Sequence, residues 1–136
     1  MAQTMLFEIV TPEGRTFSGE VEMIVLPGIE GELGIFPHHA PLVTQIVPGE
    51  IVIRTDGKDH YGVVGAGFVE ITPGRVSIMT DMALRAEEVD HAAAEEARKR
   101  AEARLQEKLS PEEERSANAA MMQALAQLNF QRKHRG

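Results

Sequence analysis

The sequence predicts an α+β protein, in which an antiparallel β-sandwich is followed by an antiparallel two-helix hairpin. Two observations support this prediction. Eleven of the 12 glycines and six of the 7 prolines precede Arg85, and there they separate short strand-like runs. From Glu87 to Leu109 the chain has neither residue and alanine dominates, which is typical of a helix. We therefore expect two domains, residues 1–85 and residues 86–136.

The first domain reads as a series of short strands with turns between them. The expected strands are 6–10, 16–26, 42–47, 50–55, 60–64, 68–71 and 75–80. Pro48-Gly49 and Pro73-Gly74 mark turns, and Asp56-Gly57 is a strong hairpin signal. Gly65-Ala66-Gly67 indicates a bulge or a close backbone approach. This spacing favours a sandwich or a flattened barrel. With aromatic residues at only 4%, its core must consist mainly of Val, Ile, Leu and Met.

The least ordinary stretch runs from Leu26 to Thr44. Its glycines recur at every third position, Gly28, Gly31 and Gly34, and three prolines accompany them. Because proline lacks a backbone donor, we expect a structured loop with a short extended piece at 34–36, and neither a helix nor a central strand. A phosphate-binding loop is excluded, because no Gly-Lys-Ser/Thr ending and no following helix pattern are present.

The second domain is expected to hold helices over about 88–108 and 111–132. Glu87, Glu88 and Asp90 lie where the positive end of the first helix dipole favours acidic residues. Ser110 is a good N-cap for the second helix, and Glu113, three residues later, completes a capping box. The short link between the helices predicts an antiparallel hairpin.

The faces expected to pack against each other in this hairpin are rich in alanine. They comprise Val89, Ala93, Ala97, Ala101, Leu105 and Leu109 on the first helix, and Ala117, Met121, Ala124, Leu125 and Leu128 on the second. Alanine buries little area, and isolated helices of this length are marginal in water. We therefore hypothesise a detachable hairpin; the alternative is a permanently packed tail.

Charge is distributed unevenly along the chain. The formal net charge is −7, and it comes from residues 1–84, since residues 85–136 hold equal numbers of acidic and basic side chains. This acidity argues against nucleic-acid binding. The chain has no cysteine, no apolar run of membrane-spanning length and no secretory signal pattern. We expect a soluble protein that meets a membrane only through its partners.

No constellation of residues predicts catalysis, a metal site or a cofactor. His38 and His39 are adjacent, so on an extended backbone they point to opposite sides. The C-terminus is basic, with Arg132, Lys133 and Arg135. These residues either complement the dipole of the last helix or contact an acidic surface of another protein.

The stretch Pro-Gly-Ile-Glu-Gly-Glu-Leu-Gly-Ile-Phe-Pro-His-His-Ala-Pro-Leu, residues 27–42, closely resembles the signature loop of the ε subunits of F-type ATP synthases. The segments 46–50, 67–71 and 76–81 and the alanine-rich hairpin follow in the order of that family. The resemblance covers nearly the whole chain. It implies two packed five-stranded sheets and a central-stalk rotor subunit with no chemistry of its own.

The resemblance also implies partners. These are the γ subunit, the c-ring and the α/β hexamer, with the chain coupling proton-driven rotation of the ring to ATP synthesis. The implied location is peripheral, on the cytoplasmic side of the bacterial inner membrane. The helical hairpin would inhibit ATP hydrolysis. The implied contact residues are Glu30, Gly31 and Glu32 for the c-ring, His39, Ala40 and Pro41 for γ, and Arg132, Lys133 and Arg135 for an acidic loop of β.

One departure from the family pattern concerns nucleotide binding. Some members bind ATP through Ile/Leu-Asp-x-x-Arg-Ala, and here the matching residues are 89–94, with Asp90 retained and Ala93 in place of the arginine. The charge-assisted contact to phosphate is missing, so we expect a vestigial site with weak or no ATP binding. Two other functions stay open: a freestanding adaptor of the same architecture, and a small metal-dependent enzyme that uses His38 and His39.

Overall fold

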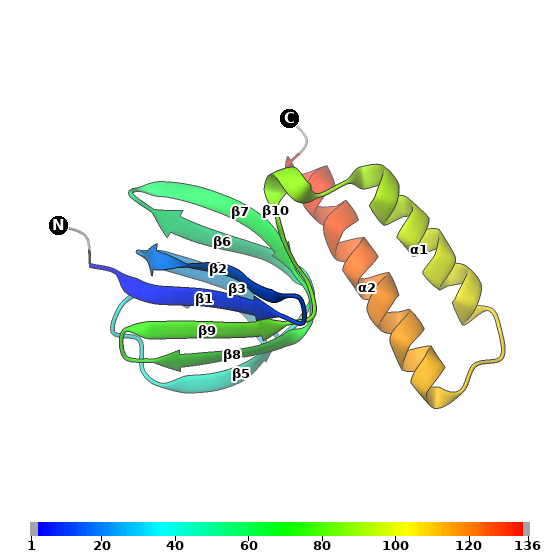
Figure 1. Ribbon diagram of the computed structural model, residues 1–136, viewed down its shortest axis with the longest axis horizontal. Helices are drawn as coiled ribbons and strands as arrows, with labels where there is room; N and C mark the ends of the chain where they lie inside the picture. The colour runs from blue at the N-terminus through cyan, green and yellow to red at the C-terminus, as the bar shows by residue number, and fades with distance from the viewer. Residues whose placement is uncertain (1–2, 135–136) are drawn as a thin grey trace.

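The computed structural model describes residues 3–134 as a β-sandwich with a helical hairpin against one end (Figure 1). The strands are β1 (Met5–Thr11), β2 (Gly14–Val21), β3 (Met23–Gly28), β4 (Gly31–Ile35), β5 (Leu42–Ile46), β6 (Gly49–Thr55), β7 (Lys58–Val64), β8 (Gly67–Thr72), β9 (Arg75–Thr80) and β10 (Ala83–Arg85). A 3-10 turn, η1 (Ala86–Glu88), precedes the helices α1 (His91–Leu105) and α2 (Pro111–His134).

The strands form two layers, β10-β7-β6-β3-β4 and β5-β8-β9-β1-β2. The layers agree with the expected five-stranded sheets, but they belong to one continuous hydrogen-bonded network. They are joined through β3, which pairs with β6 along Met23–Val25 and with β5 at Gly28 and Ile46. The sandwich is therefore a single sheet that folds back on itself, and its two layers are joined by hydrogen bonds along one side.

One strand pair departs from the expected antiparallel arrangement. β1 and β9 run parallel, from Leu6 beside Arg75 to Val10 beside Met79. No turn joins these strands, so their relative direction is not restricted as it is in a hairpin. The other strand pairs within residues 3–134 are antiparallel.

The expected single strand 16–26 is wrong, because it divides at Glu22 into β2 and β3, which belong to different layers. Met23 and Ile24 are both buried, although they are consecutive. Consecutive residues of one strand point to opposite faces, so burial of both means that both faces of the chain are covered here, where it passes from one layer to the other. The Glu22 amide donates to the Arg54 carbonyl of β6 at 2.8 Å, at the start of the second layer.

The glycine-rich stretch is a hairpin of two strands, where a loop was expected. β3 continues to Gly28 and β4 begins at Gly31, and Pro27 lies inside β3, paired with Glu32. The prediction that Pro27 could not lie in such a strand is wrong. Its carbonyl accepts a hydrogen bond from the Val47 amide at 2.8 Å, so proline here needs to act only as an acceptor.

The core of the sandwich is aliphatic, as the composition predicts. Its fully buried side chains include Ile24, Leu26, Ile35, Val69 and Ile78, with Phe7 as the one aromatic ring below 2% exposure among the described residues. These side chains come from both layers, so each layer buries one face against the other.

The first helix is shorter than expected. Residues 86–88 form η1, and α1 begins only at His91, with the Asp90 carboxylate accepting from the Ala93 amide at 3.2 Å. The predicted capping box of α2 is confirmed, since the Glu113 amide donates to Ser110 Oγ at 3.2 Å and the Ser110 amide to Glu113 Oε1 at 3.0 Å.

The seam between the helices is made of alanine, as expected. Its buried residues are Ala94 and Ala101 on α1 and Ala117 and Ala124 on α2. Two expected members are wrong: Ala93 is exposed and Leu125 is 36% exposed. On α1 the structure therefore buries Ala94 in place of Ala93, whereas Ala101 is buried as predicted.

Candidate partner-binding surfaces

The acidic tip is the turn between β3 and β4, residues Glu30, Gly31 and Glu32, all of them exposed. Gly31 has φ +120°, which side chains rarely adopt, so a glycine is required at this turn. The pKa of Lys133 in α2 is raised mainly by its hydrogen bond to Glu50 and the charge of Glu50, and the charge of Glu32 adds a smaller contribution. The expected c-ring residues thus form one acidic protrusion near the end of α2.

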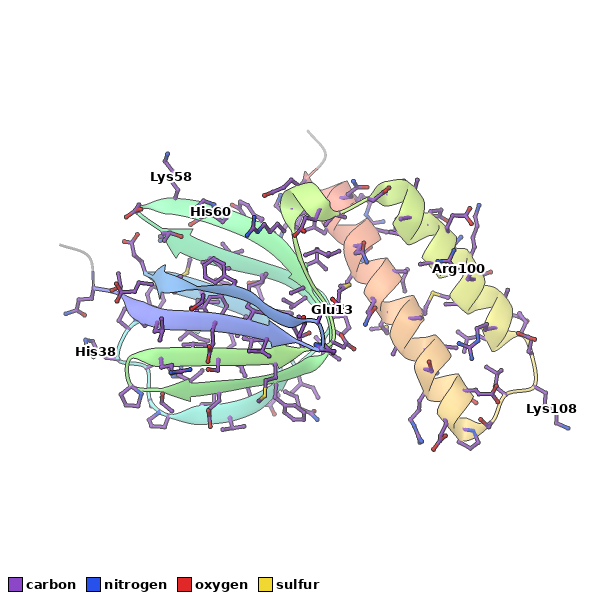
Figure 2. All side chains as sticks on the ribbon, viewed as in Figure 1. Glu13, His38, Lys58, His60, Arg100 and Lys108 are labelled. Atoms are coloured by element: carbon purple, nitrogen blue, oxygen red, sulfur yellow. The ribbon has the colours of Figure 1, made fainter. Side chains whose placement is uncertain are left out.

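The loop between β4 and β5 holds the residues expected to contact γ. The His39 amide donates to the Phe36 carbonyl at 3.2 Å, and His39 Nδ1 donates to the Ala40 carbonyl at 2.6 Å, which orders this loop. Ala40 and Pro41 are exposed. The neighbouring His38 lies at the end of the sandwich away from the helices (Figure 2). β4 therefore separates the loop from the acidic tip.

Residues 3–134 contain no group of three or more His, Cys, Asp or Glu side chains placed to hold a metal ion. His38 has φ +70° and is exposed, and His39 is occupied by the Ala40 carbonyl. Nothing in this geometry favours the enzyme alternative.

An exposed apolar patch on the outer face of the second layer was not predicted. We define it as Val10, Val43, Phe68 and Met79, with exposed fractions of 36, 65, 48 and 54%. Phe68 pairs with Met79, and Met79 with Val10, so three of them form one row across β8, β9 and β1. The alternation with buried Val69 and Ile78 could have revealed it, because residues between inward-facing positions point outward.

The basic end of α2 is partly occupied. Lys133 Nζ lies 2.8 Å from Glu50 Oε2 of β6, and Arg132 Nη2 donates to Asn129 Oδ1 at 3.0 Å within the helix. The third expected residue, Arg135, lies outside the described residues. Glu50 was not predicted as a contact residue, because nothing local in the sequence relates β6 to the end of the chain.

Glu50 also accepts a hydrogen bond from His134 Nε2 at 2.6 Å. Burial raises the pKa of the Glu50 carboxyl, but the hydrogen bonds and charges of Lys133 and His134 outweigh burial and lower that pKa. The His134 ring contacts two aromatic rings, with its centroid 4.8 Å from that of Tyr61 and 4.4 Å from that of Phe130.

Asp90, the expected vestigial nucleotide residue, acts as the N-cap of α1. A cavity of about 770 Å³ lies between α2 and the segment before α1, lined by Tyr61, Ala86, Glu87, His91, Phe130, Gln131 and His134. None of these described lining residues is lysine or arginine, and Glu87 is acidic. The lining is consistent with weak ATP binding, which stays a prediction.

Within the described part of the chain, neither helix is long and apolar enough to cross a membrane.

Two family models match consecutive parts of the chain. The β-sandwich domain of the ATP synthase Delta/Epsilon chain matches residues 4–86, and the long alpha-helix domain of the same chain matches residues 87–130. The chain is 46% identical over 132 residues to the ATP synthase epsilon chain of Dehalococcoides mccartyi, covering 93% of this chain and 94% of the relative. It is 40% identical over 129 residues to ATP synthase epsilon chain 1 of Methylococcus capsulatus, covering 94% and 92%.

Solved structures share the fold. A chain of the Euglena gracilis mitochondrial ATP synthase, described as OSCP/F1/c-ring in rotational state 1, gives a TM-score of 0.73 at 24% identity, covering 90% of this chain and 78% of that one. A chain of the Tetrahymena thermophila mitochondrial ATP synthase, described as central stalk/c-ring, gives 0.66 at 15% identity, covering 93% and 96%. The matched domains and the long, closely related relatives confirm the resemblance seen in the sequence: the chain belongs to the epsilon-chain family of ATP synthase.

Proposed function

We propose that this chain is the non-catalytic ε subunit of the central stalk in a proton-translocating F-type ATP synthase. It couples rotation of the c-ring to ATP synthesis from ADP and phosphate in the α/β hexamer. Membership of the epsilon-chain family supports this proposal, and so do the central-stalk and c-ring assemblies that contain its structural neighbours. The observation in this chain that carries it is the apolar patch on the outer sheet, which calls for a protein partner.

The patch and the His39 loop together form the proposed γ-binding surface. Contiguous exposed apolar side chains on a small protein mark an interaction site. Val43 is 65% exposed near the start of β5, directly after the loop of His39, Ala40 and Pro41. The loop and the patch are therefore continuous, and γ would cover both.

The acidic tip is the proposed contact with the c-ring. It lies at the other end of β4 from the His39 loop, about 16 Å away for a five-residue strand. The tip is polar and exposed, in contrast to the apolar patch. The two surfaces can therefore bind different partners at the same time.

The hairpin is the proposed inhibitor of ATP hydrolysis. Its alanine seam and its small contact with the sandwich support a hairpin that can leave the docked position. Once undocked, Arg132, Lys133 and Arg135 would meet an acidic surface of the β subunit. This assignment places the protein on the cytoplasmic face of the bacterial inner membrane, held there by the complex. The domain division at residues 85–86 is part of the same proposal.

Co-purification with γ tests the assignment. Phe68→Glu and Met79→Glu each place a charge in the patch, and we expect each to reduce the γ that is recovered by at least about tenfold, since a buried unpaired charge is costly. Met122→Glu is the control, because Met122 is similarly exposed, at 49%, but belongs to α2 and not to the sheet. Equal recovery of γ by all three variants would contradict the proposed surface. Failure of the unaltered chain to bind γ would contradict the assignment itself and favour a freestanding adaptor.

ATPase rates of the complex test the inhibitory part. A chain ended after Glu88 keeps β10, which pairs with β7, and removes both helices. We expect faster ATP hydrolysis with this chain than with the full chain. An unchanged rate would remove inhibition from the proposal and leave coupling.

A further inference from the structure

The docked hairpin is held by one carboxylate of the sandwich. Glu50 lies in β6, and its side chain is 17% exposed. Lys133 Nζ lies 2.8 Å from one of its oxygens, and His134 Nε2 lies 2.6 Å from the other. Both oxygens of the carboxylate are therefore engaged by consecutive residues at the end of α2. No other ion pair joins α2 to the sandwich within residues 3–134.

The apolar part of the docking contact is small. Of α2, only Ala126 and Phe130 join the buried cluster with Val63 and Val89. The amide contacts are weak: Gln127 donates to Met82 Sδ, a poor acceptor, at 3.5 Å, and Gln131 reaches the Val89 carbonyl only at 3.5 Å. Glu50 therefore supplies the short polar contacts that hold α2 against the sandwich.

We propose that Glu50 is the latch of the docked hairpin, and that by binding Lys133 and His134 it withholds them from an acidic surface of a partner protein. The donors that a partner carboxylate would need are the ones that Glu50 uses. In the docked position Glu50 holds both donors against β6, so these contacts must break before α2 can carry Lys133 and His134 to a separate surface. The docked and partner-bound positions are then mutually exclusive, and Glu50 sets the balance between them.

The aromatic contacts couple this ion pair to the apolar cluster. His134 contacts both Tyr61 of β7 and Phe130 of α2, and Phe130 is itself 5% exposed. Release of His134 from Glu50 therefore also loosens the packing around Phe130. The contacts of Glu50 and the aromatic contacts of His134 should therefore be lost together when the hairpin undocks.

Hydrogen exchange of the isolated full-length chain tests the latch. We expect Glu50→Gln to speed exchange of the α2 amides beyond residue 124 by about tenfold, since two charge-assisted contacts are weakened. Glu13→Gln is the matched control: it also removes one carboxylate, and Glu13 lies in the β1–β2 turn at the end of the sandwich that faces the hairpin (Figure 2). Salt should speed the same amides in the unaltered chain but not in Glu50→Gln, because ion pairs are screened.

Exchange at the unaltered rate in Glu50→Gln would overturn the latch. If the sandwich strands also exchange faster, Lys133→Gln provides a second route, since it leaves the sandwich unchanged. The double variant should then exchange no faster than Glu50→Gln if Lys133 acts through Glu50.

The withheld surface is tested in the assembled ATP synthase, and this part rests on the proposed function. With more of the hairpin undocked, Glu50→Gln should slow ATP hydrolysis by the complex, whereas Glu13→Gln should not. An equal or faster rate would overturn the withholding of Lys133 and His134. A chain that shows the exchange effect but does not bind γ would contradict the proposed function alone.

Discussion

Removal of the Phe130 ring should undock the hairpin without unfolding the sandwich. Phe130 is 5% exposed and packs against Val63, Val89 and Ala126. Phe→Ala changes in a closed core cost about 3–5 kcal/mol, part of which comes from the cavity that remains. Here α2 can move away, so no cavity has to persist. The cost should then be the lost burial alone, about 2–3 kcal/mol.

A loss of this size shifts the docking equilibrium by about 30- to 140-fold, since 1.4 kcal/mol corresponds to a factor of ten. Hydrogen exchange of full-length Phe130→Ala should show it as faster exchange in the second half of α2, with β1, β8 and β9 unchanged. Met122→Ala is the control on the same helix, because Met122 is 49% exposed. If the sandwich strands lost protection together with α2, the hairpin and the sandwich would be one cooperative unit, and the reasoning would be refuted.

Three further predictions concern single sites. Gly67→Ala should destabilise the sandwich by several kcal/mol in chemical denaturation, because an added Cβ would lie 1.9 Å from the Met79 carbonyl oxygen; unchanged stability would contradict this close approach. Asp90→Ala should cost about 1 kcal/mol and fray the start of α1 in amide exchange, since the Ala93 amide loses its acceptor; unaltered exchange at Ala93 would contradict the cap. Acid should release the hairpin, because the pKa of Glu50 is lowered in the docked protein. The contribution of Glu50 to docking is therefore present above the ordinary glutamate pKa of about 4.3, and it is lost as the pH falls through the lowered pKa. The protection of the α2 amides, taken relative to their intrinsic exchange rates at each pH, should therefore fall as the pH drops through the lowered Glu50 pKa in the unaltered chain, and much less in Glu50→Gln.

Local signals in the sequence predicted local structure well. The capping box of Ser110 and Glu113 and the turn at Asp56-Gly57 depend on residues a few positions apart, and both occur as expected. The alanine seam also occurs, although Ala93 and Leu125 are exposed. The change of layer at Glu22 was missed, because period-two alternation continues through it and only the burial of consecutive residues reveals it.

Contacts between distant segments could not be predicted in this way. The sequence argued against a strand at Pro27 because proline has no backbone N–H. In the structure the Pro27 carbonyl accepts a hydrogen bond from the Val47 amide, and this bond needs no donor from Pro27. Glu50 and Lys133 are 83 residues apart, and no periodic pattern relates them. The outer-sheet patch is intermediate: the outward direction of Phe68 follows from alternation, whereas its alignment with Met79 and Val10 requires the register of three strands.

The parallel pairing of β1 with β9 has a consequence for the order of events during synthesis. Glu8 and Ser77, which face each other across this pair, are 69 residues apart in the chain. When β1 and β2 leave the ribosome, they have no neighbour on the β9 side until most of the protein has been translated. Long-range pairing of this kind slows folding, whereas α1 and α2 require only a short link to meet. The helices, which are made after the strands, can thus acquire their structure fastest, whereas β1 and β2 must wait for β9.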